Sequence, residues 1–439
     1  MDEPKNYVCI LRYSLFAGLA LIGVTSVQPQ GAAISARRPP QDVFISNDFQ
    51  VTSATTALVW SSSGSGTTPE GHPASRLSRL WIVDLGRGPT HPAWTEQRLP
   101  SEYPDGYPWR RDYYVPSARI LYLFWIDGRS LVTTRCRIRG DCTPISRVDV
   151  SHHKGMGQPA SVGPVAGVSD ANFWVFADDI GGLSTRPKVL GHTVDGGRSW
   201  RFFDDANPAL FKDPRVLWTG FPQLLVPRSR SELWIVTFQT LPLRLVITRT
   251  MDAGVHWAKA RTPVSSHHFT DCCGPFGFVG REPASQRRDG ASDCVDAMVA
   301  QNKYTDQTPD EPVDLKRFCS RDDGRTWTID SLHLPLTWTS PQAPPGLTYA
   351  TDSLGWLSVA DSVGHVQSWQ TRDGGARWSP LPTALRQLVG DSLVISAAQR
   401  SGQSLWLIAA PPNYPPEGSN RLLYSPNLGL QWTVIQPPR

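Results

Sequence analysis

Several features that would identify a common class of protein are scarce or missing in this chain. Its 439 residues carry a formal net charge of only +4, and no basic block occurs, which argues against nucleic-acid binding. Beyond the N-terminal region, no apolar run approaches the length of a membrane span. No Cys-x-x-Cys pair supports a zinc site, and we expect neither a metal nor another cofactor. No long helical pattern occurs, so the chain is expected to consist of strands.

The first 36 residues have the pattern of an export signal. Lys5 and Arg12 precede an apolar run of about 13 residues, and small residues near 33–36 offer a cleavage site. Cleavage would leave a domain of residues 37–439 that is secreted or periplasmic. The alternative is an uncleaved N-terminal anchor, and apart from it we expect no membrane contact.

Cysteine usage agrees with export, because an even number of cysteines in an exported chain suggests disulfides. Outside the signal segment the cysteines are Cys136, Cys142, Cys272, Cys273, Cys294 and Cys319. The segment CRIRGDC could close a tight hairpin between Cys136 and Cys142. Cys294 and Cys319 would lie on adjacent strands of one sheet, whereas the pairing of Cys272 and Cys273 is left open.

An eight-residue motif repeats five times and organises the chain. Each copy fits Ser/Thr-x-Asp-x-Gly-x-x-Trp, with Asn427 replacing Asp in the last one. The five copies, called boxes below, are TVDGGRSW (193–200), TMDAGVHW (250–257), SRDDGRTW (320–327), TRDGGARW (371–378) and SPNLGLQW (425–432). Successive third positions are 57, 70, 51 and 54 residues apart, a period typical of stacked or ring-forming repeats.

Short apolar runs such as SELWIVTFQ and SLWLIAA precede the boxes, and each repeat has room for about four strands. Four short strands make one blade of a β-propeller. The segments 57–99 and 119–138 show the same rhythm without a box. We therefore predict an all-β fold, a single propeller of seven four-stranded blades, with six or eight as alternatives. The segment 42–48 is expected to pair with the last strand, near 431–436, and so to close the ring.

Every defining residue of the box has a structural role in a tight turn. Asp and Ser/Thr side chains accept hydrogen bonds from nearby backbone N–H groups, and Gly permits a positive φ. The terminal Trp can pack between sheets. We therefore assign structural roles to Asp195, Gly197, Trp200, Asp252, Gly254, Trp257, Asp322, Gly324, Trp327, Asp373, Gly375, Trp378, Asn427, Gly429 and Trp432.

The boxes are similar to Asp-box, or BNR, repeats, and residues 165–436 resemble the Asp-box β-propeller superfamily. That superfamily includes sialidases, some endoglucanases, sortilin-type receptors and photosystem II assembly factors. The segment 348–378, with Gly355 and Trp356 ahead of its box, looks like the assembly-factor repeats and implies a binding scaffold.

Resemblance to the sialidase branch would imply an Arg-Ile-Pro motif and a cluster of arginines that holds a carboxylate. No Arg-Ile-Pro occurs in the chain. Tyr114, Gln158 and Phe221 occupy the comparable positions, so the sequence departs from the sialidase pattern at these points.

Candidate ligand-binding residues are expected at the end of the sheets opposite the boxes, where propellers usually bind. Aromatic rings and carboxylates suit sugar faces and hydroxyls, and arginine suits an anion. The binding candidates are Tyr103, Tyr107, Trp109, Arg110, Arg111, Tyr114 and Arg281. For the aromatic residues of 101–114 the alternative is a solvated loop whose rings pack on neighbouring blades. Glycoside hydrolysis needs two carboxylates roughly 5–10 Å apart. The catalytic candidates for that chemistry are Asp112, Asp271 and Glu282.

The sequence thus predicts an exported, monomeric propeller that binds a protein or polysaccharide as a scaffold or binding module. The alternative is a glycoside hydrolase, sialidase-like or endoglucanase-like, that uses loop carboxylates. A third alternative is a metal-dependent enzyme that uses two His pairs, His152 with His153 and His267 with His268.

Overall fold

The computed structural model describes residues 44–63, 77–104, 111–152, 159–179, 188–204, 221–240, 243–259, 287–289, 292–300, 313–322, 326, 328–332, 346–360, 365–412 and 420–436. The chain divides into two compact units, Met1–Pro40 and Gln41–Arg439, and every described residue belongs to the second. The expected cleavage site near 33–36 therefore lies outside the described residues.

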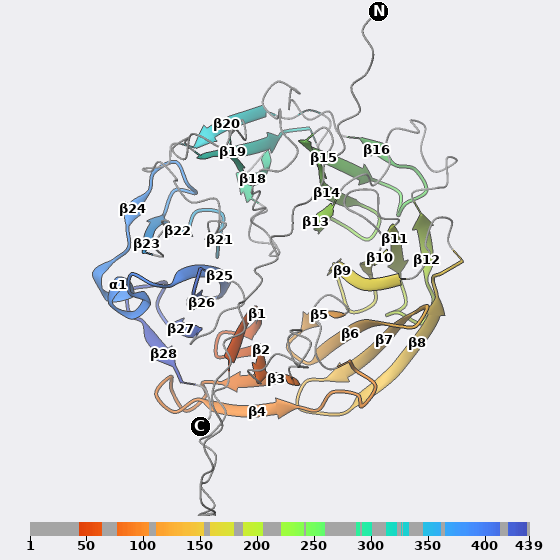
Figure 1. Ribbon diagram of the computed structural model, residues 1–439, viewed down its shortest axis with the longest axis horizontal. Coiled ribbons are helices and arrows are strands. Elements are labelled where there is room, and N and C mark those ends of the chain that lie inside the picture. Colours follow the sequence, from red (N-terminus) through yellow and green to blue (C-terminus); the bar gives the residue numbers. More distant parts are fainter. Residues whose placement is uncertain are drawn as a thin grey trace, which may run out of the picture. The chain divides into compact units, whose positions relative to one another are not determined.

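The chain is mostly β, and within the described residues the strands form seven four-stranded antiparallel sheets (Figure 1). We number these sheets 1 to 7 in chain order. Sheet 1 contains β1 (Phe44–Ser53), β2 (Thr56–Ser63), β3 (Leu77–Asp84) and β4 (Ala93–Gln97). Sheet 2 contains β5 (Arg111–Ser117), β6 (Ile120–Asp127), β7 (Ser130–Arg137) and β8 (Cys142–Asp149). Sheet 3 contains β9 (Pro159–Gly167), β10 (Phe173–Asp179), β11 (Lys188–Thr193) and β12 (Arg201–Asp204).

The remaining four sheets repeat the same plan. Sheet 4 contains β13 (Phe221–Pro227), β14 (Leu233–Thr240), β15 (Leu243–Thr250) and β16 (Ala258–Lys259). Sheet 5 contains β17 (Arg287–Asp289), β18 (Ser292–Ala300), β19 (Val313–Ser320) and β20 (Thr328–Leu332). Sheet 6 contains β21 (Gly346–Tyr349), β22 (Gly355–Ala360), β23 (Val366–Thr371) and β24 (Ser379–Pro380). Sheet 7 contains β25 (Val394–Ser401), β26 (Ser404–Ala410), β27 (Arg421–Ser425) and β28 (Thr433–Ile435).

Each sheet is a meander in which every strand pairs with its neighbours in the chain. Connections between first and second strands and between third and fourth strands consequently leave the sheet at one end, which we call the box end. Connections between second and third strands, and those from one sheet to the next, leave at the other end, which we call the loop end. Both ends carry connecting segments, where binding and catalytic residues are most often found.

Both faces of the central strands are buried, which explains their continuous apolar runs. On β2, Leu58 and Trp60 pack towards sheet 2, whereas Ala57 and Val59 pack towards sheet 7. Successive side chains of a strand point to opposite faces, so one strand contributes to two cores. Burying one such large aliphatic side chain stabilises the fold by roughly 1.5–3 kcal/mol.

The cores lie between consecutive sheets. In the described residues, apolar clusters fill the spaces between sheets 1 and 2, 2 and 3, 3 and 4, 6 and 7, and 7 and 1. Sheet 5 is joined to sheet 6 by Arg317 of β19, which is 8% exposed and donates a hydrogen bond to the carbonyl oxygen of Gly374. Figure 1 shows the first strands of the sheets towards a common centre and the fourth strands outside.

The two ends of the described chain meet in a way that differs from the sequence prediction. β1 begins within the segment 42–48 but pairs with β2, and β28 pairs with β27, so no strand is shared between the first and last sheets. Instead, the buried Gln399 of β25 bonds to β1: it accepts from Val51 N at 2.7 Å and donates to Phe49 O at 2.9 Å. The expected pairing near 431–436 was therefore wrong, because a first strand of its own completes sheet 1.

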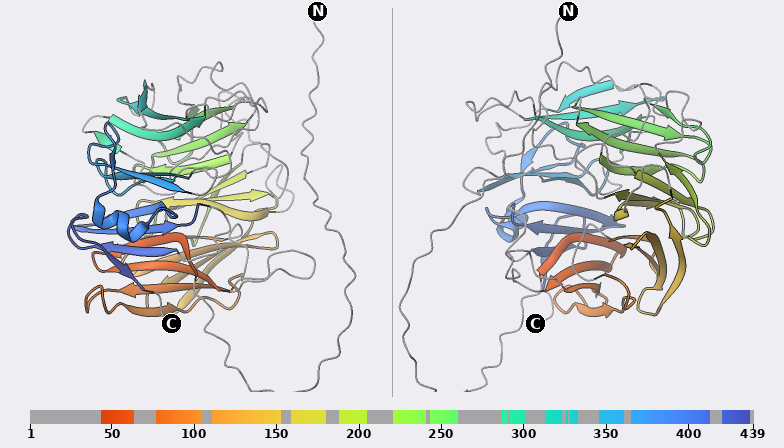
Figure 2. Two further views of the ribbon diagram at one scale, coloured as in Figure 1. Left: turned by 60° about the vertical axis from the view of Figure 1, so that its left-hand side comes forward. Right: turned by 45° about the vertical axis from the view of Figure 1, so that its right-hand side comes forward.

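One short helix, α1 (Thr383–Val389), lies in the connection from sheet 6 to sheet 7 (Figure 2). Its Leu385 and Val389 are buried in the cluster between these two sheets. Gly390, at φ +73°, ends it. Across the described ranges there is no helix with both the length and the apolar character to cross a membrane.

Candidate functional site

The five boxes all lie at the box end, between the third and fourth strands of sheets 3 to 7. Four of the boxes, those of sheets 3, 4, 6 and 7, are also tied to the neighbouring turn between the first and second strands by a described hydrogen bond. Gly196 N donates to Ala171 O at 2.9 Å, and Gly374 N donates to Ser353 O at 2.8 Å. The two turns of a sheet therefore form one hydrogen-bonded unit.

The first box shows how its residues build the turn. Thr193 Oγ1 donates to Asp195 Oδ1 at 2.8 Å and accepts from Gly197 N at 2.9 Å. The other side of the Asp195 carboxylate accepts from Ser199, whose N–H lies 2.9 Å from Oδ1 and whose hydroxyl lies 2.6 Å from Oδ2. The carboxylate is therefore occupied by the turn itself.

Among the described residues, the same bonds recur in the other boxes, with a different donor at the seventh position. His256 Nδ1 lies 2.7 Å from Asp252 Oδ2, and Arg377 Nε donates to Asp373 Oδ2 at 2.9 Å. The side chain of Arg377 and then its backbone N–H lower the pKa of Asp373 to about 2. In the fifth box the direction of this side-chain hydrogen bond is reversed, because Asn427 Nδ2 donates to Gln431 Oε1 at 3.3 Å.

The box glycines have the expected backbone conformation. The φ values of the four described box glycines are +84° at Gly197, +85° at Gly254, +92° at Gly375 and +87° at Gly429. At Gly254 an added Cβ would also lie 2.4 Å from the ring of Phe203, so only glycine fits. Gly324 lies outside the described residues.

The box tryptophans pack between sheets to different extents. Trp257 is 5% exposed and lies edge-on to Trp174, with ring centroids 6.3 Å apart. Trp200, Trp378 and Trp432 are half-buried, and Trp327 lies outside the described residues. Together with the bonded carboxylates, this packing supports a structural role for the box residues.

Two of the expected ligand-binding aromatics are used for packing. Tyr103 is 6% exposed and lies between Trp60 and Trp125, at centroid distances of 6.0 and 5.3 Å. Tyr114 is half-buried, and its hydroxyl donates to Ser169 O at 3.3 Å. Burial, followed by the charge of Asp170, raises the pKa of Tyr114. These positions favour packing roles over the ligand-binding roles that the sequence predicted.

Asp112 is the one catalytic candidate among the described residues. It lies near the start of β5, at the loop end, and its Oδ1 accepts from Tyr113 N at 2.8 Å. Of Arg111 only the backbone is described, as the first residue of the same strand. The other binding and catalytic candidates lie outside the described residues, namely Tyr107, Trp109, Arg110, Asp271, Arg281 and Glu282.

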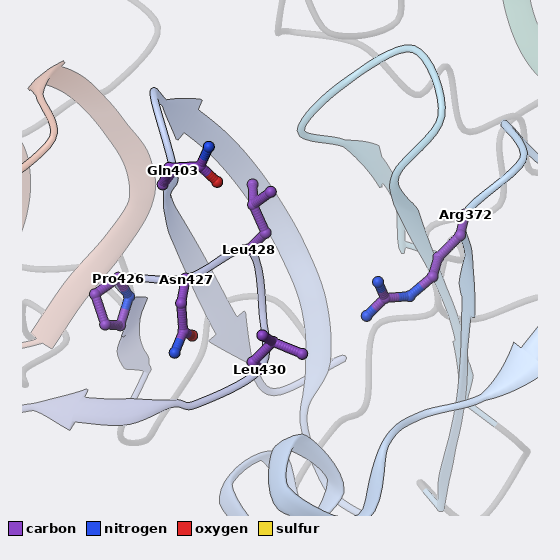
Figure 3. Close-up of a pocket in the computed structure, with 6 residues that line it drawn as sticks. All are labelled: Arg372, Gln403, Pro426, Asn427, Leu428 and Leu430. Atoms are coloured by element: carbon purple, nitrogen blue, oxygen red, sulfur yellow. The ribbon is translucent and has the colours of Figure 1, made fainter.

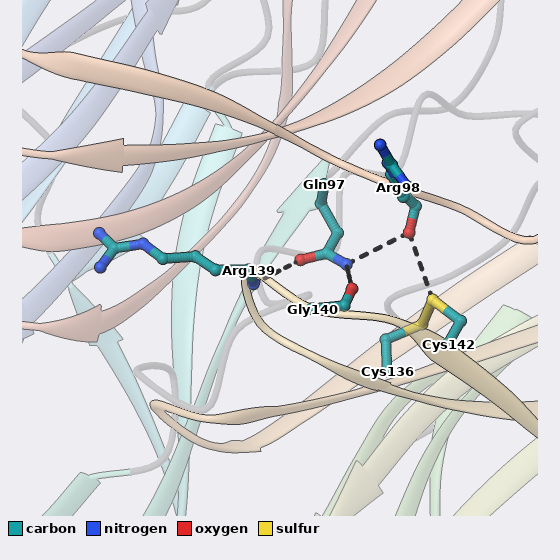
Figure 4. The surroundings of a disulfide bond; sticks show 6 residues. All are labelled: Gln97, Arg98, Cys136, Arg139, Gly140 and Cys142. Atoms are coloured by element: carbon teal, nitrogen blue, oxygen red, sulfur yellow. Dashed lines mark hydrogen bonds between the residues drawn. A yellow bond between two sulfur atoms is a disulfide. The ribbon is translucent and has the colours of Figure 1, made fainter.

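The expected disulfide between Cys136 and Cys142 is present and closes the hairpin between β7 and β8 (Figure 4). The buried Gln97 of sheet 1 docks against this hairpin: it donates to Gly140 O at 2.8 Å and accepts from Arg139 N at 2.8 Å. Cys142 Sγ lies 3.3 Å from Arg98 O. This is a close contact and not a hydrogen bond, because a disulfide sulfur carries no proton. The disulfide thus shapes a contact between sheets 1 and 2.

The remaining cysteines are partly outside the described residues. Cys319 is disulfide-bonded, and the residue directly opposite it in the register of β18 and β19 is Cys294. This register agrees with the adjacent strands that the sequence predicted. Cys272 and Cys273 lie outside the described residues.

Where the structure describes the chain, no group of three or more His, Cys, Asp and Glu side chains is placed to hold a metal ion. Of the two histidine pairs, only His152 is described, and it is exposed. His153, His267 and His268 lie outside the described residues.

A hollow that the sequence reasoning missed lies at the box end, between sheets 6 and 7 (Figure 3). Its volume is about 390 Å³, and its lining residues are Arg372, Gln403, Pro426, Asn427, Leu428 and Leu430. Arg372 is the second residue of the fourth box, and Pro426 and Leu430 are the second and sixth of the fifth. The side chains at these variable box positions were the available signal in the sequence.

Comparison with known proteins gives structural likenesses only. No family model matches the chain, and no curated protein matches it. One similar solved structure is the β-propeller domain of the trilobed protease from Pyrococcus furiosus, at 7% identity and a TM-score of 0.48, covering 90% of this chain and 98% of that one.

Two further similar structures come from carbohydrate-related proteins. An α-L-arabinanase from Penicillium chrysogenum, complexed with arabinobiose, is 14% identical with a TM-score of 0.41, over 76% of this chain and 96% of that one. A lectin from Burkholderia pseudomallei is 11% identical with a TM-score of 0.46, over 90% of this chain and 99% of that one.

Proposed function

We propose that the chain is an exported, seven-bladed β-propeller of the Asp-box type that binds a protein or polysaccharide at its loop end. The blades correspond to sheets 1 to 7, and the ring is completed by the contact between sheets 7 and 1. On this proposal the protein acts as a monomeric scaffold or binding module.

The observation that carries the proposal is the unequal length of the connections at the two ends. At the box end, the longest connection between described strands has eight residues, 85–92. At the loop end, the connection from β12 to β13 spans the 16 residues 205–220, and that from β16 to β17 spans the 27 residues 260–286. Long connections on a rigid scaffold are where binding residues concentrate.

The choice of ligand class follows from the residues that these connections carry. The segment 101–114 combines aromatic residues with Arg110 and Arg111, and Asp112 lies where this segment enters β5. Aromatic faces with nearby charged groups suit a glycan or an extended polypeptide. Because Tyr103 is already buried, Tyr107 and Trp109 are the aromatic residues of choice for contact with a ligand.

The proposal is tested by measuring binding of the purified full-length chain to a glycan array and to soluble polysaccharides. Trp109→Ala and Arg110→Gln are expected to weaken binding by about tenfold or more, as loss of an aromatic or charged anchor does. Arg87→Gln, at the exposed box end of sheet 1, serves as the matched control and should bind like the unchanged chain.

A different outcome would favour the alternative enzyme. Release of reducing sugar by the purified chain, abolished by Glu282→Gln or Asp112→Asn, would establish a glycoside hydrolase in place of a binding module. Equal loss of binding in Arg87→Gln and Arg110→Gln would contradict a site at the loop end.

A further inference from the structure

We propose that the box end carries a second binding site, independent of the loop end. In this proposal the hollow between sheets 6 and 7 binds a polypeptide segment in which an acidic side chain is next to an aliphatic one.

The box turns display the side chains of their second and sixth positions. Val194 and Met251, both at the second position, are 63% and 51% exposed. Val255 and Leu430, both at the sixth, are 43% and 73% exposed. With Val168 of the β9–β10 turn, these are the exposed large hydrophobic residues of the described chain, and all lie at the box end. Of these five residues, Leu430 lines the hollow between sheets 6 and 7, and the other four belong to sheets 3 and 4.

Arg372 supplies an unused positive charge at this surface. The nearby Arg377 is already bonded to Asp373, whereas the exposed Arg372 guanidinium has no hydrogen-bond or ion-pair partner among the described residues. A guanidinium can hold a carboxylate through two parallel hydrogen bonds. Figure 3 shows the Arg372 side chain extending from sheet 6 towards the two leucines of sheet 7.

The opposite wall of the hollow is aliphatic. Leu428 is half-buried, with part of its side chain packed on the core between sheets 6 and 7, and Leu430 stands exposed beside it. Pro426 extends the same wall. An aliphatic side chain placed here would remove apolar surface from water on both partners, which is favourable.

The polar groups in the lining fit a polypeptide better than a sugar. The side-chain amide of Gln403 has no partner among the described residues and can donate to, or accept from, a peptide group. Among the described residues that line this hollow, none has an aromatic ring on which a sugar face could stack. Its volume of about 390 Å³ falls in the range of small binding sites, enough for a few side chains.

The test uses a capped tetrapeptide, acetyl-Ala-Asp-Leu-Ala-amide, and its counterpart with Asn in place of Asp. Binding of each to the full-length chain is followed by ligand-observed NMR titration. The Asp peptide is expected to bind about tenfold more tightly than the Asn peptide, because a charged bidentate contact replaces a neutral one. Arg372→Gln should remove this difference.

Two further variants separate the apolar contribution from the charge. Leu430→Ser is expected to weaken both peptides by about fivefold through lost apolar contact, and its exposure means that the fold does not depend on it. Val194→Ser and Arg87→Gln, which are also exposed but lie at the box ends of other sheets, are matched controls that should change neither affinity.

The proposal is overturned if neither peptide binds, or if the Asp and Asn peptides bind equally. It is also overturned if Arg87→Gln reduces binding as much as Arg372→Gln, since the attraction would then be a general effect of charge. Octanoate is a third probe: if it binds as tightly as the Asp peptide and depends equally on Arg372, the hollow accepts amphiphilic anions and the polypeptide assignment is wrong. None of these outcomes bears on the loop end, so the two proposals stand or fall separately.

Discussion

The imidazole of His192 lies flat against the indole of Trp174, with ring centroids 3.6 Å apart and an interplanar angle of 6°. His192 is 4% exposed on β11, and Arg201 lies opposite it on β12. Burial, and then the charge of Arg201, lower the pKa of His192 to about 4. The histidine is therefore neutral in the folded protein at ordinary pH.

This lowered pKa predicts a loss of stability on acidification. At pH values between about 6.5, the ordinary histidine pKa, and the lowered pKa of the folded state, His192 is protonated in the unfolded chain but neutral in the folded chain. The contribution of His192 is intact above that window and falls by roughly 3 kcal/mol across it as the pH decreases. Guanidinium unfolding at pH 7 and pH 4.5 measures the change.

His192→Phe keeps a flat ring against Trp174 without a titratable group, so its unfolding midpoint should fall less between these two pH values. His91→Gln, which replaces an exposed histidine, should keep the full dependence of the unchanged chain. An equal fall in His192→Phe and the unchanged chain would rule out His192 as the source.

Substitutions of a box aspartate are expected to lower the free energy of unfolding by different amounts. Asp195→Ala leaves the Ser199 N–H and both hydroxyl partners without their acceptor, and we expect a loss of about 1–3 kcal/mol in unfolding free energy. Asp195→Asn should cost less, because Asn427 accepts the corresponding N–H of Gln431 through Oδ1 at 2.9 Å in the fifth box. Chemical denaturation of the two variants compares them, and equal losses would contradict the hydrogen-bond account.

Substitution of Gly254 in the second box is expected to cause a steric clash, and a control variant can separate this clash from the effect of the positive φ. Gly254→Ala would carry both an unfavourable φ of +85° and a contact with Phe203, with a total cost of about 2–5 kcal/mol. Gly88→Ala has a similar φ of +95° but open space around its Cβ, so it should cost about 1–2 kcal/mol. Thermal unfolding measures both, and an equal shift would show that the Phe203 contact is easily relieved.

Removal of the hairpin disulfide is expected to loosen the contact between sheets 1 and 2. Replacing Cys136 and Cys142 together by Ala should lower stability by about 2 kcal/mol, as expected for release of a short loop. Amide exchange at Arg139, whose N–H donates to Gln97, should become faster. Exchange at Val132, which is buried in β7 away from the hairpin turn, is the internal control. Unchanged exchange at Arg139 would mean that Gln97 holds the hairpin without help.

The features predicted correctly from the sequence are those fixed by short stretches of chain. The box turn is built from residues within four positions of one another, such as Thr193 and Gly197, so its chemistry is readable from the motif alone. The hairpin from Cys136 to Cys142 is equally local. Short apolar runs predicted the strands, because the central strands are buried on both faces.

The features that the sequence did not predict depend on partners far away in the chain. Tyr103 occurs in a polar stretch, but its burial depends on Trp60 and Trp125 in two different sheets. The contact between the first and last sheets depends on Gln399, which no local pattern marks. The hollow requires Arg372 and Leu430, 58 positions apart, to face each other across two blades of the proposed propeller.

The bonds from Gln399 to β1 also determine how the protein would respond to mechanical load. No described strand is shared between sheets 1 and 7, so tension applied at the start of β1 meets side-chain bonds and apolar contacts rather than a shared row of backbone bonds. Under pulling, we expect this seam to yield first, while the five sheets with boxes keep their turns. A tether on the N-terminal segment would thus load the contact between sheets 1 and 7 directly.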